Sequence, residues 1–202
     1  MMALRDVGRL GTVREIPVVE LPDAVRSVPF AHVARRGAGR IDLHVSGALP
    51  PCWVLNLARG FAARRVSLQS GRARRLDEGI WSGALEIDLG CAQRPLPDFL
   101  ALASGERGSA RLLPAPPLLE VAMAGGARGL EVEVHAWDAV GLLASVLGHV
   151  DALELEPTEV SLETEGDCAF HQLVLCDRTG ATPSRRQRRA LARRLAAQLR
   201  AV

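Results

Sequence analysis

An internal repeat constrains the fold of this chain more than any other feature of its sequence. Apolar positions recur at one offset over about 34 positions, a match that chance apolar runs seldom produce. Trp53, Val54, Leu57, Ala58 and Phe61 each lie 89 positions before their counterparts, Leu142, Leu143, Val146, Leu147 and Val150. We therefore predict a tandem duplication.

Each copy shows the same order of local patterns. Two extended segments joined by a glycine-containing turn come first, as in a β-hairpin, and a helix follows. Two further extended runs and a second helix close the copy. The first copy has extended segments at 28–34, 41–46, 64–70 and 80–89 and helices from Trp53 and over 96–103; the second has extended segments at 117–123, 130–135, 153–164 and 168–176 and helices from Leu142 and from Ser184, a predicted N-cap.

This order predicts an α+β fold of two tandem ferredoxin-like βαββαβ sandwiches, each an antiparallel sheet with its helices on one face. The expected domains are 28–105 and 117–202, with a linker over 106–116 and an N-terminal extension over 1–27, in which 13–21 has a strand pattern. The open sheet face would expose Leu, Val and Cys side chains. We therefore expect intrachain pairing of the copies or a homodimer to cover it.

Composition excludes several classes of protein. The chain has 202 residues, 48% of them hydrophobic, so it can fill a core. Its formal net charge of +2 gives no strong overall electrostatic field that would attract it to nucleic acid or membranes. No apolar stretch reaches the roughly 18 residues of a membrane span, and the N-terminus lacks a signal-peptide core. The four cysteines form no C-x-x-C pair. We expect a cytoplasmic protein with free thiols.

Catalytic and metal-binding motifs are missing from the sequence. It contains no G-x-S-x-G, Walker or G-x-G-x-x-G motif, and Cys52 has no evident base. The histidines show no metal-ligand spacing, and we interpret them as polar positions on the open sheet face: His32, His44, His135, His149 and His171. We expect no enzyme activity, no cofactor and no metal.

The most informative local pattern is a strand, a tight loop and a helix over 132–150. Alternation runs to His135, a turn covers 138–141, and apolar residues then recur at helical spacing. Asp138, followed by Gly141-Leu142-Leu143, resembles the D-R-P-G-L-L signature of the ACT domain, a small ligand-sensing module. The segment 116–134 and the loop 177–180 are similar to the C-terminal ACT repeat of bacterial PII uridylyltransferase/uridylyl-removing enzymes.

The resemblance implies regulatory domains, which in that enzyme family sense glutamine, and none of its catalytic parts. It implies a ligand site formed by Trp137, Asp138, Ala139, Val140, Gly141 and Leu142. Asp138 would accept a hydrogen bond from a ligand ammonium, and N–H groups near Gly141 would meet its carboxylate. Ala139 and Val140 replace the Arg and Pro of the signature. In the first copy Leu49 and Cys52 replace its Asp and Gly, so we expect that copy to be degenerate as a binding site.

Other interpretations of these residues remain open. Asp138 suits a helix cap as well as a ligand site, and Trp137 suits an interface seam better than a pocket. The seven arginines of the last helix form either a solvated face, which the near-neutral total charge favours, or a nucleic-acid surface. The leading hypothesis is a non-catalytic regulator that senses an amino acid or similar metabolite and acts on an unidentified partner protein. The alternatives are a ligand-free interaction module and a nucleic-acid-associated regulator.

Overall fold

A computed structural model describes residues 28–199 except 38, 78, 91–95 and 106–114. The extension 1–27, with its strand pattern at 13–21, and most of the linker 106–116 lie outside the described residues. The elements, in chain order, are β1 (Phe30–Arg35), β2 (Arg40–Ala48), α1 (Trp53–Arg64), β3 (Ser67–Asp77), β4 (Ile80–Asp88), α2 (Phe99–Ala103), β5 (Leu118–Gly126), β6 (Gly129–Trp137), α3 (Leu142–Asp151), β7 (Leu155–Glu165), β8 (Cys168–Asp177) and α4 (Arg185–Ala196).

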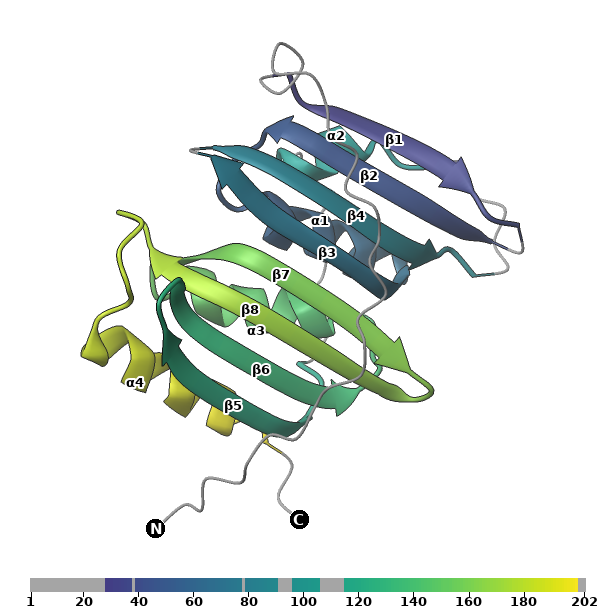
Figure 1. Cartoon of the computed structure of the whole chain (residues 1–202). Coiled ribbons are helices and arrows are strands. Elements are labelled where there is room, and N and C mark those ends of the chain that lie inside the picture. Colours follow the sequence, from purple (N-terminus) through teal and green to yellow (C-terminus); the bar gives the residue numbers. More distant parts are fainter. Residues whose placement is uncertain (1–27, 38, 78, 91–95, 106–114, 200–202) are drawn as a thin grey trace.

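The strands form one antiparallel eight-stranded sheet, in the order β1-β2-β4-β3-β7-β8-β6-β5. Read inward from either outer edge, the order is the same in both halves of the chain, 28–105 and 115–199. The helices lie behind the sheet, on one face (Figure 1). An α+β fold with an antiparallel sheet is therefore confirmed, and the two halves pair within one chain through β3 and β7.

The junction between β3 and β7 is symmetric. Arg72 lies opposite Ser161, and the flanking pairs Ser70–Glu163 and Arg74–Glu159 are arranged evenly around them. Arg72 and Ser161 differ by the same 89 positions that separate the apolar repeats. The axis of a two-fold rotation that exchanges the halves would therefore pass through this pair, as in a two-fold symmetric dimer.

The element order corrects one detail of the prediction. Each half runs β-β-α-β-β-α instead of βαββαβ, because the strand that completes the outer edge of the sheet comes first. β1 and β5 reach those edges through short hairpins with β2 and β6, which need no crossover connection.

One hydrophobic core fills the space between the sheet and the helices. Alternate residues of the central strands point into it, such as Leu43 and Val45 of β2 and Val132 and Val134 of β6. Helices α1 and α3 each bury the apolar stripe expected from the sequence and contact one another across the junction. The two halves therefore share one core.

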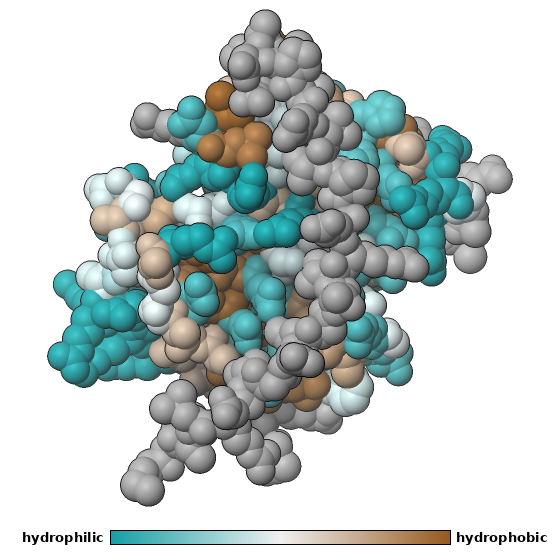
Figure 2. Space-filling model, viewed as in Figure 1, coloured by the Kyte–Doolittle hydropathy of each residue, from teal (hydrophilic) through white to brown (hydrophobic). Residues whose placement is uncertain are grey.

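The open face of the sheet is more polar than predicted. Its registers place Asp42 beside Glu86 and Arg72 beside Ser161. Figure 2 shows this face crossed by hydrophilic side chains. Within the described residues, the exposed large hydrophobic side chains are Val28, Leu76, Leu119, Trp137 and Leu199. The open face is therefore less apolar than predicted: most Leu and Val side chains of the strands turn toward the helices, whereas Val174, Cys168 and Cys176 lie on the open face.

Two boundaries also differ from the prediction. β3 continues to Asp77 instead of ending near Ser70, because pairing with both β4 and β7 holds an Arg-rich stretch extended. Helix α2 is short and begins at Phe99, after the N-cap Asp98. The predicted cap of the last helix is confirmed: Ser184 accepts a hydrogen bond from the Gln187 N–H, in a capping box.

Candidate functional site

Two clefts lie where the halves meet. Each combines the start of one central helix with the end of the other, because α1 and α3 pack side by side across the junction. The narrow cleft contains the start of α3 and the wide cleft contains the start of α1. The helix starts matter because the first N–H groups of a helix have no carbonyl partner within it.

The narrow cleft contains most of the predicted site. From the second half it is lined by 138–144 and His171, and from the first half by Ala58, Phe61, Ala62, Val66, Ser67 and Leu68. Its volume is about 30 Å³, so it has room for about two water molecules. Five of the six predicted residues, Asp138 to Leu142, line it. Trp137 does not, because it points to the open sheet face with His135.

The wide cleft is about 360 Å³. It is lined by Pro51, Cys52 and Leu55 from the first half and by Leu147, Val150, Asp151, Leu155, Glu156, Pro157 and Arg178 from the second. The copy predicted to be degenerate therefore supplies the helix start of the larger cleft. Sequence comparison of the two loops missed this cleft because most of its wall comes from the other half of the chain.

The two clefts are counterparts under the 89-residue offset. Except for Arg178, every residue of the wide cleft corresponds to a residue that lines the narrow one. Phe61 in the narrow cleft becomes Val150 in the wide cleft, which leaves more space. Ala62 and Ser67 become Asp151 and Glu156, which add charge. The wide cleft thus has two carboxylates at positions that carry no charge in the narrow one.

The starts of the two helices differ in backbone conformation. Gly141 is the N-cap of α3 with φ 93°, a left-handed value that disfavours residues with a Cβ, whereas Cys52 caps α1 with φ −93°. Neither makes a side-chain cap hydrogen bond. Asp138 is not the N-cap of α3, so the capping interpretation of this residue is wrong. Its backbone N–H donates to the Asp167 carbonyl.

The ionisable groups of the narrow cleft are both perturbed. Burial lowers the pKa of His171 to about 4, so its ring is neutral at pH 7. Burial and then the nearby charge of Asp167 raise the pKa of Asp138. The narrow cleft therefore holds an uncharged imidazole in its wall and a carboxyl group that gains a proton more readily than usual.

His171 was expected on the open face, and that prediction is wrong. It lies on β8 opposite Leu162 and Val134, in the buried row that includes Ala169, Leu173 and Leu175. The period of two along this strand was the signal that could have placed it. Its counterpart in the first half, opposite Ala73 and Val45, is Gly83. A Cβ there would lie 3.1 Å from the Trp53 ring, which occupies the equivalent space.

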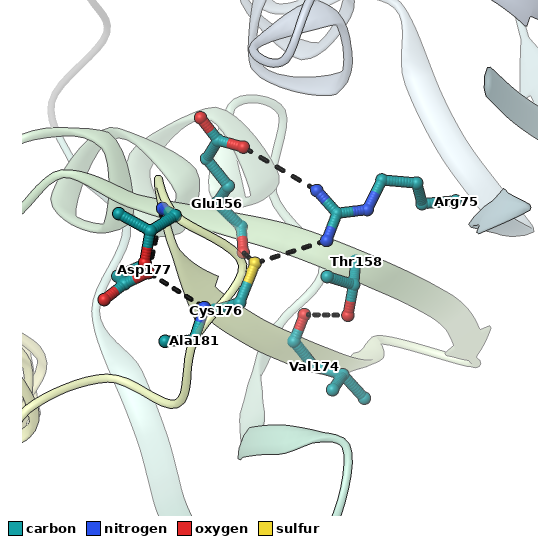
Figure 3. A network of polar contacts seen from close by, with 8 residues as sticks. Arg75, Glu156, Thr158, Val174, Cys176, Asp177 and Ala181 are labelled. Carbon is teal, nitrogen blue, oxygen red and sulfur yellow. Dashed lines mark hydrogen bonds and ion pairs between the residues drawn. The ribbon is translucent and has the colours of Figure 1, made fainter. Parts of the chain in front are cut away.

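A polar network adjoins the wide cleft (Figure 3). The guanidinium of Arg75 reaches from β3 across the junction to the Glu156 carboxylate, at 3.9 Å, and donates to the Cys176 Sγ at 3.5 Å. Arg178, at the mouth of the cleft, lies 3.7 Å from Glu154 and its side chain is 57% exposed. Both halves therefore contribute charge around this cleft.

The remaining candidate groups do not converge. His135 and His171 lie on paired strands but point to opposite faces of the sheet. No metal-ligand cluster is found among the described residues, and Cys52, Cys168 and Cys176 are free thiols. No helix in the described part of the chain is long and apolar enough to cross a membrane.

The arginines of α4 form an exposed basic surface. Leu191 and Leu195 face the core, while Arg185, Arg186, Arg189, Arg193 and Arg194 are exposed. None of these five arginines lies within ion-pair distance of a described carboxylate. Arg188 instead lies over β5, close to Gly125.

The clefts and the exposed α4 surface are the candidate sites of this chain. Comparison with protein-family models, curated proteins and solved structures finds no match. Functional inference therefore depends on the geometry of these sites.

Proposed function

We propose that this chain is a non-catalytic regulatory protein whose two ACT-like halves sense an amino acid or a similar small metabolite. Each half contains the β-α-β-β-α order of a ferredoxin-like unit. Its first strand takes the outer-edge position that the last strand of a βαββαβ unit would occupy. We interpret the halves as circularly permuted ferredoxin-like sandwiches, joined side by side like the subunits of a dimer.

The wide cleft is the observation that carries this proposal. Its volume of about 360 Å³ lies within the range of small-molecule sites. Leu55, Leu147 and Val150 give it apolar walls, whereas Asp151, Glu156 and Arg178 supply charges of both signs. An amino acid needs this combination: a carboxylate partner, an ammonium partner and an apolar surface for its side chain.

Regulation would follow from the position of the cleft. Because its walls come from both halves, a ligand that contacts both walls favours one arrangement of the halves over others. The energy available for this shift is limited to the difference in ligand affinity between the arrangements. A partner protein that recognises only one of them would then report ligand concentration.

The predicted site at Asp138 to Leu142 has a more limited role in this proposal. With about 30 Å³, the narrow cleft would have to open before it could take a whole amino acid. We therefore assign amino-acid binding to the wide cleft.

A thermal-shift screen against the twenty amino acids tests the proposal. At 100 times its dissociation constant a ligand adds about 2.7 kcal/mol, which for a chain of this size raises Tm by about 5–10 °C. Asp151→Asn and Arg178→Gln should each weaken the response about tenfold, because each removes a charged partner of the ligand. Arg185→Gln, on the exposed face of α4, is the matched control and should respond like the wild type. A folded protein with no response to any amino acid would refute the sensor.

A nucleic-acid-associated regulator is the second candidate, favoured by the exposed α4 arginines. Binding of a duplex or single-stranded oligonucleotide should then fall steeply with salt. Replacing Arg185, Arg186 and Arg189 with Ala should weaken it further. Affinity that is independent of salt and of these arginines would exclude this candidate.

A further inference from the structure

His171 is a buried polar side chain without a hydrogen-bond partner. Among the described residues, the buried polar residues are Ser46 and His171. The Ser46 hydroxyl donates to the Trp81 carbonyl, but within the part of the chain that the structure describes no group bonds to the His171 ring, whose Nδ1 is sealed from solvent. Because a buried polar group without a partner destabilises the fold, such a group in a cleft wall points to a ligand or water.

The surroundings of the ring determine which proton it carries. His171 lines the narrow cleft, and its Nδ1 is sealed from solvent whereas its Nε2 is not among the sealed atoms, which makes Nε2 the nitrogen that can face a ligand there. A buried N–H without an acceptor is rarer than an acceptor without a donor. The neutral ring therefore carries its proton on Nε2 and presents an N–H donor to the cleft.

The start of α3 adds donors to the same cleft. Leu143 and Ala144 are the second and third residues of the helix, so their N–H groups have no carbonyl one turn earlier within it. The adjacent N–H groups are already used: Leu142 donates to the Ala139 carbonyl and Ser145 to the Gly141 carbonyl. Gly141, the residue before the helix, adds no side chain between these donors and the cleft. The interior of the cleft thus offers donors on two sides.

We propose that the narrow cleft binds the carboxylate group of a small monocarboxylate, with the imidazole of His171 and the first turn of α3 as its hydrogen-bond donors. The available space suits a group of two or three heavy atoms, of which formate is the smallest complete example. Asp138 lines the cleft as an exposed residue, where its negative charge opposes an anion and limits affinity. This site is distinct from the wide cleft and does not depend on the proposed amino-acid function.

Thermal-shift titration with sodium formate, at ionic strength held constant with sodium chloride, tests this inference. Formate should raise Tm of the wild-type chain in a saturable manner, and chloride should not. His171→Phe should abolish the response because it keeps an aromatic ring without a donor. His135→Phe, on the neighbouring strand but on the open face, is the matched control and should keep it. A wild-type response in His171→Phe, or no response in the wild type, would overturn the proposal.

Asp138→Asn identifies the sign of charge that the cleft prefers. Loss of the carboxylate should tighten formate binding at least threefold, because it removes a like charge. Weaker formate binding in this variant would contradict the proposed repulsion and overturn the anion site.

NMR of the wild-type imidazole keeps the proposal testable if His171→Phe does not fold. Long-range ¹H–¹⁵N spectra should show a neutral ring protonated on Nε2, with a shift at that nitrogen on formate addition. A ring protonated on Nδ1 would overturn the assignment. Asp151→Asn and Arg178→Gln should keep the formate response even if they lose the amino-acid response, so failure of one site is distinguishable from failure of the other.

Discussion

The narrow and wide clefts occupy equivalent places in the two halves but differ in size and chemistry. Nine equivalent positions line both clefts, and the side chains at these and a few further positions set the difference. In the narrow cleft, Phe61 fills space and His171 supplies a neutral polar group. In the wide cleft, Val150 leaves space and Asp151 supplies charge. Two equivalent places on one scaffold thus differ in volume and charge because their lining side chains differ.

The two halves also differ in one pair of packed residues, one on the helix and one on the strand beneath it. In the first half, Trp53 packs edge-on against Trp81 and covers Gly83. In the second half, Leu142 replaces Trp53, and His171 stands where Gly83 is. The second half therefore has a smaller residue on the helix, Leu142 in place of Trp53, and a larger residue on the strand, His171 in place of Gly83. Such compensation is what a close-packed core requires.

The largest predicted difference between the halves concerns pH. The pKa of His171 is about 4 in the folded chain and about 6.5 when unfolded, so the unfolded state binds more protons between these values. The free energy of unfolding is therefore not lowered by His171 above pH 6.5. As pH falls below this value, proton binding by the unfolded state lowers the free energy of unfolding, by about 3 kcal/mol at pH 4. Urea unfolding of wild type and His171→Leu from pH 7 to pH 4 measures it. A variant with the wild-type pH dependence would contradict the assignment to His171.

The next largest difference concerns the two helix starts. Gly141→Ala should destabilise the chain by about 1–2 kcal/mol, since an L side chain is strained at a φ of 93°. Cys52→Ala should change stability by less than about 0.5 kcal/mol, because Cys52 is exposed and already has an ordinary φ of −93°. Chemical denaturation of both variants makes the comparison. Equal costs would mean that the two starts are not distinguished by backbone conformation.

The smallest difference concerns the polar contacts beside the clefts. Arg75→Ala removes the contacts with Glu156 and Cys176 and should cost about 1 kcal/mol. Thr164→Ala, at the equivalent position of the second half, should cost less than about 0.5 kcal/mol. Both values follow from urea midpoints at constant salt. If removing Arg75 has no effect, its contacts across the junction do not stabilise the pairing of the halves.

Local patterns alone predicted most of the secondary structure. Apolar spacing located α1 and α3, period-two alternation located β2 and β6, and the Ser184 cap marked the start of α4. These features depend on neighbours within a few residues, so a single sequence contains them. β3 was predicted too short because Arg72, Arg74 and Arg75 interrupt its apolar pattern, and only its pairing with β7 keeps that stretch extended.

The sequence by itself also determined the duplication and the loop at Asp138 to Leu142. Only the tertiary structure decided what that loop faces. The pairing of β3 with β7 brings the start of each central helix against the end of the other, and residues from both halves of the chain then line each cleft. No local pattern encodes that contact, because the free energy that favours it comes from packing apolar surface of both halves into one core. The helix start with the weaker signature lies in the larger cleft because Val150, from the other half, stands there in place of the bulkier Phe61.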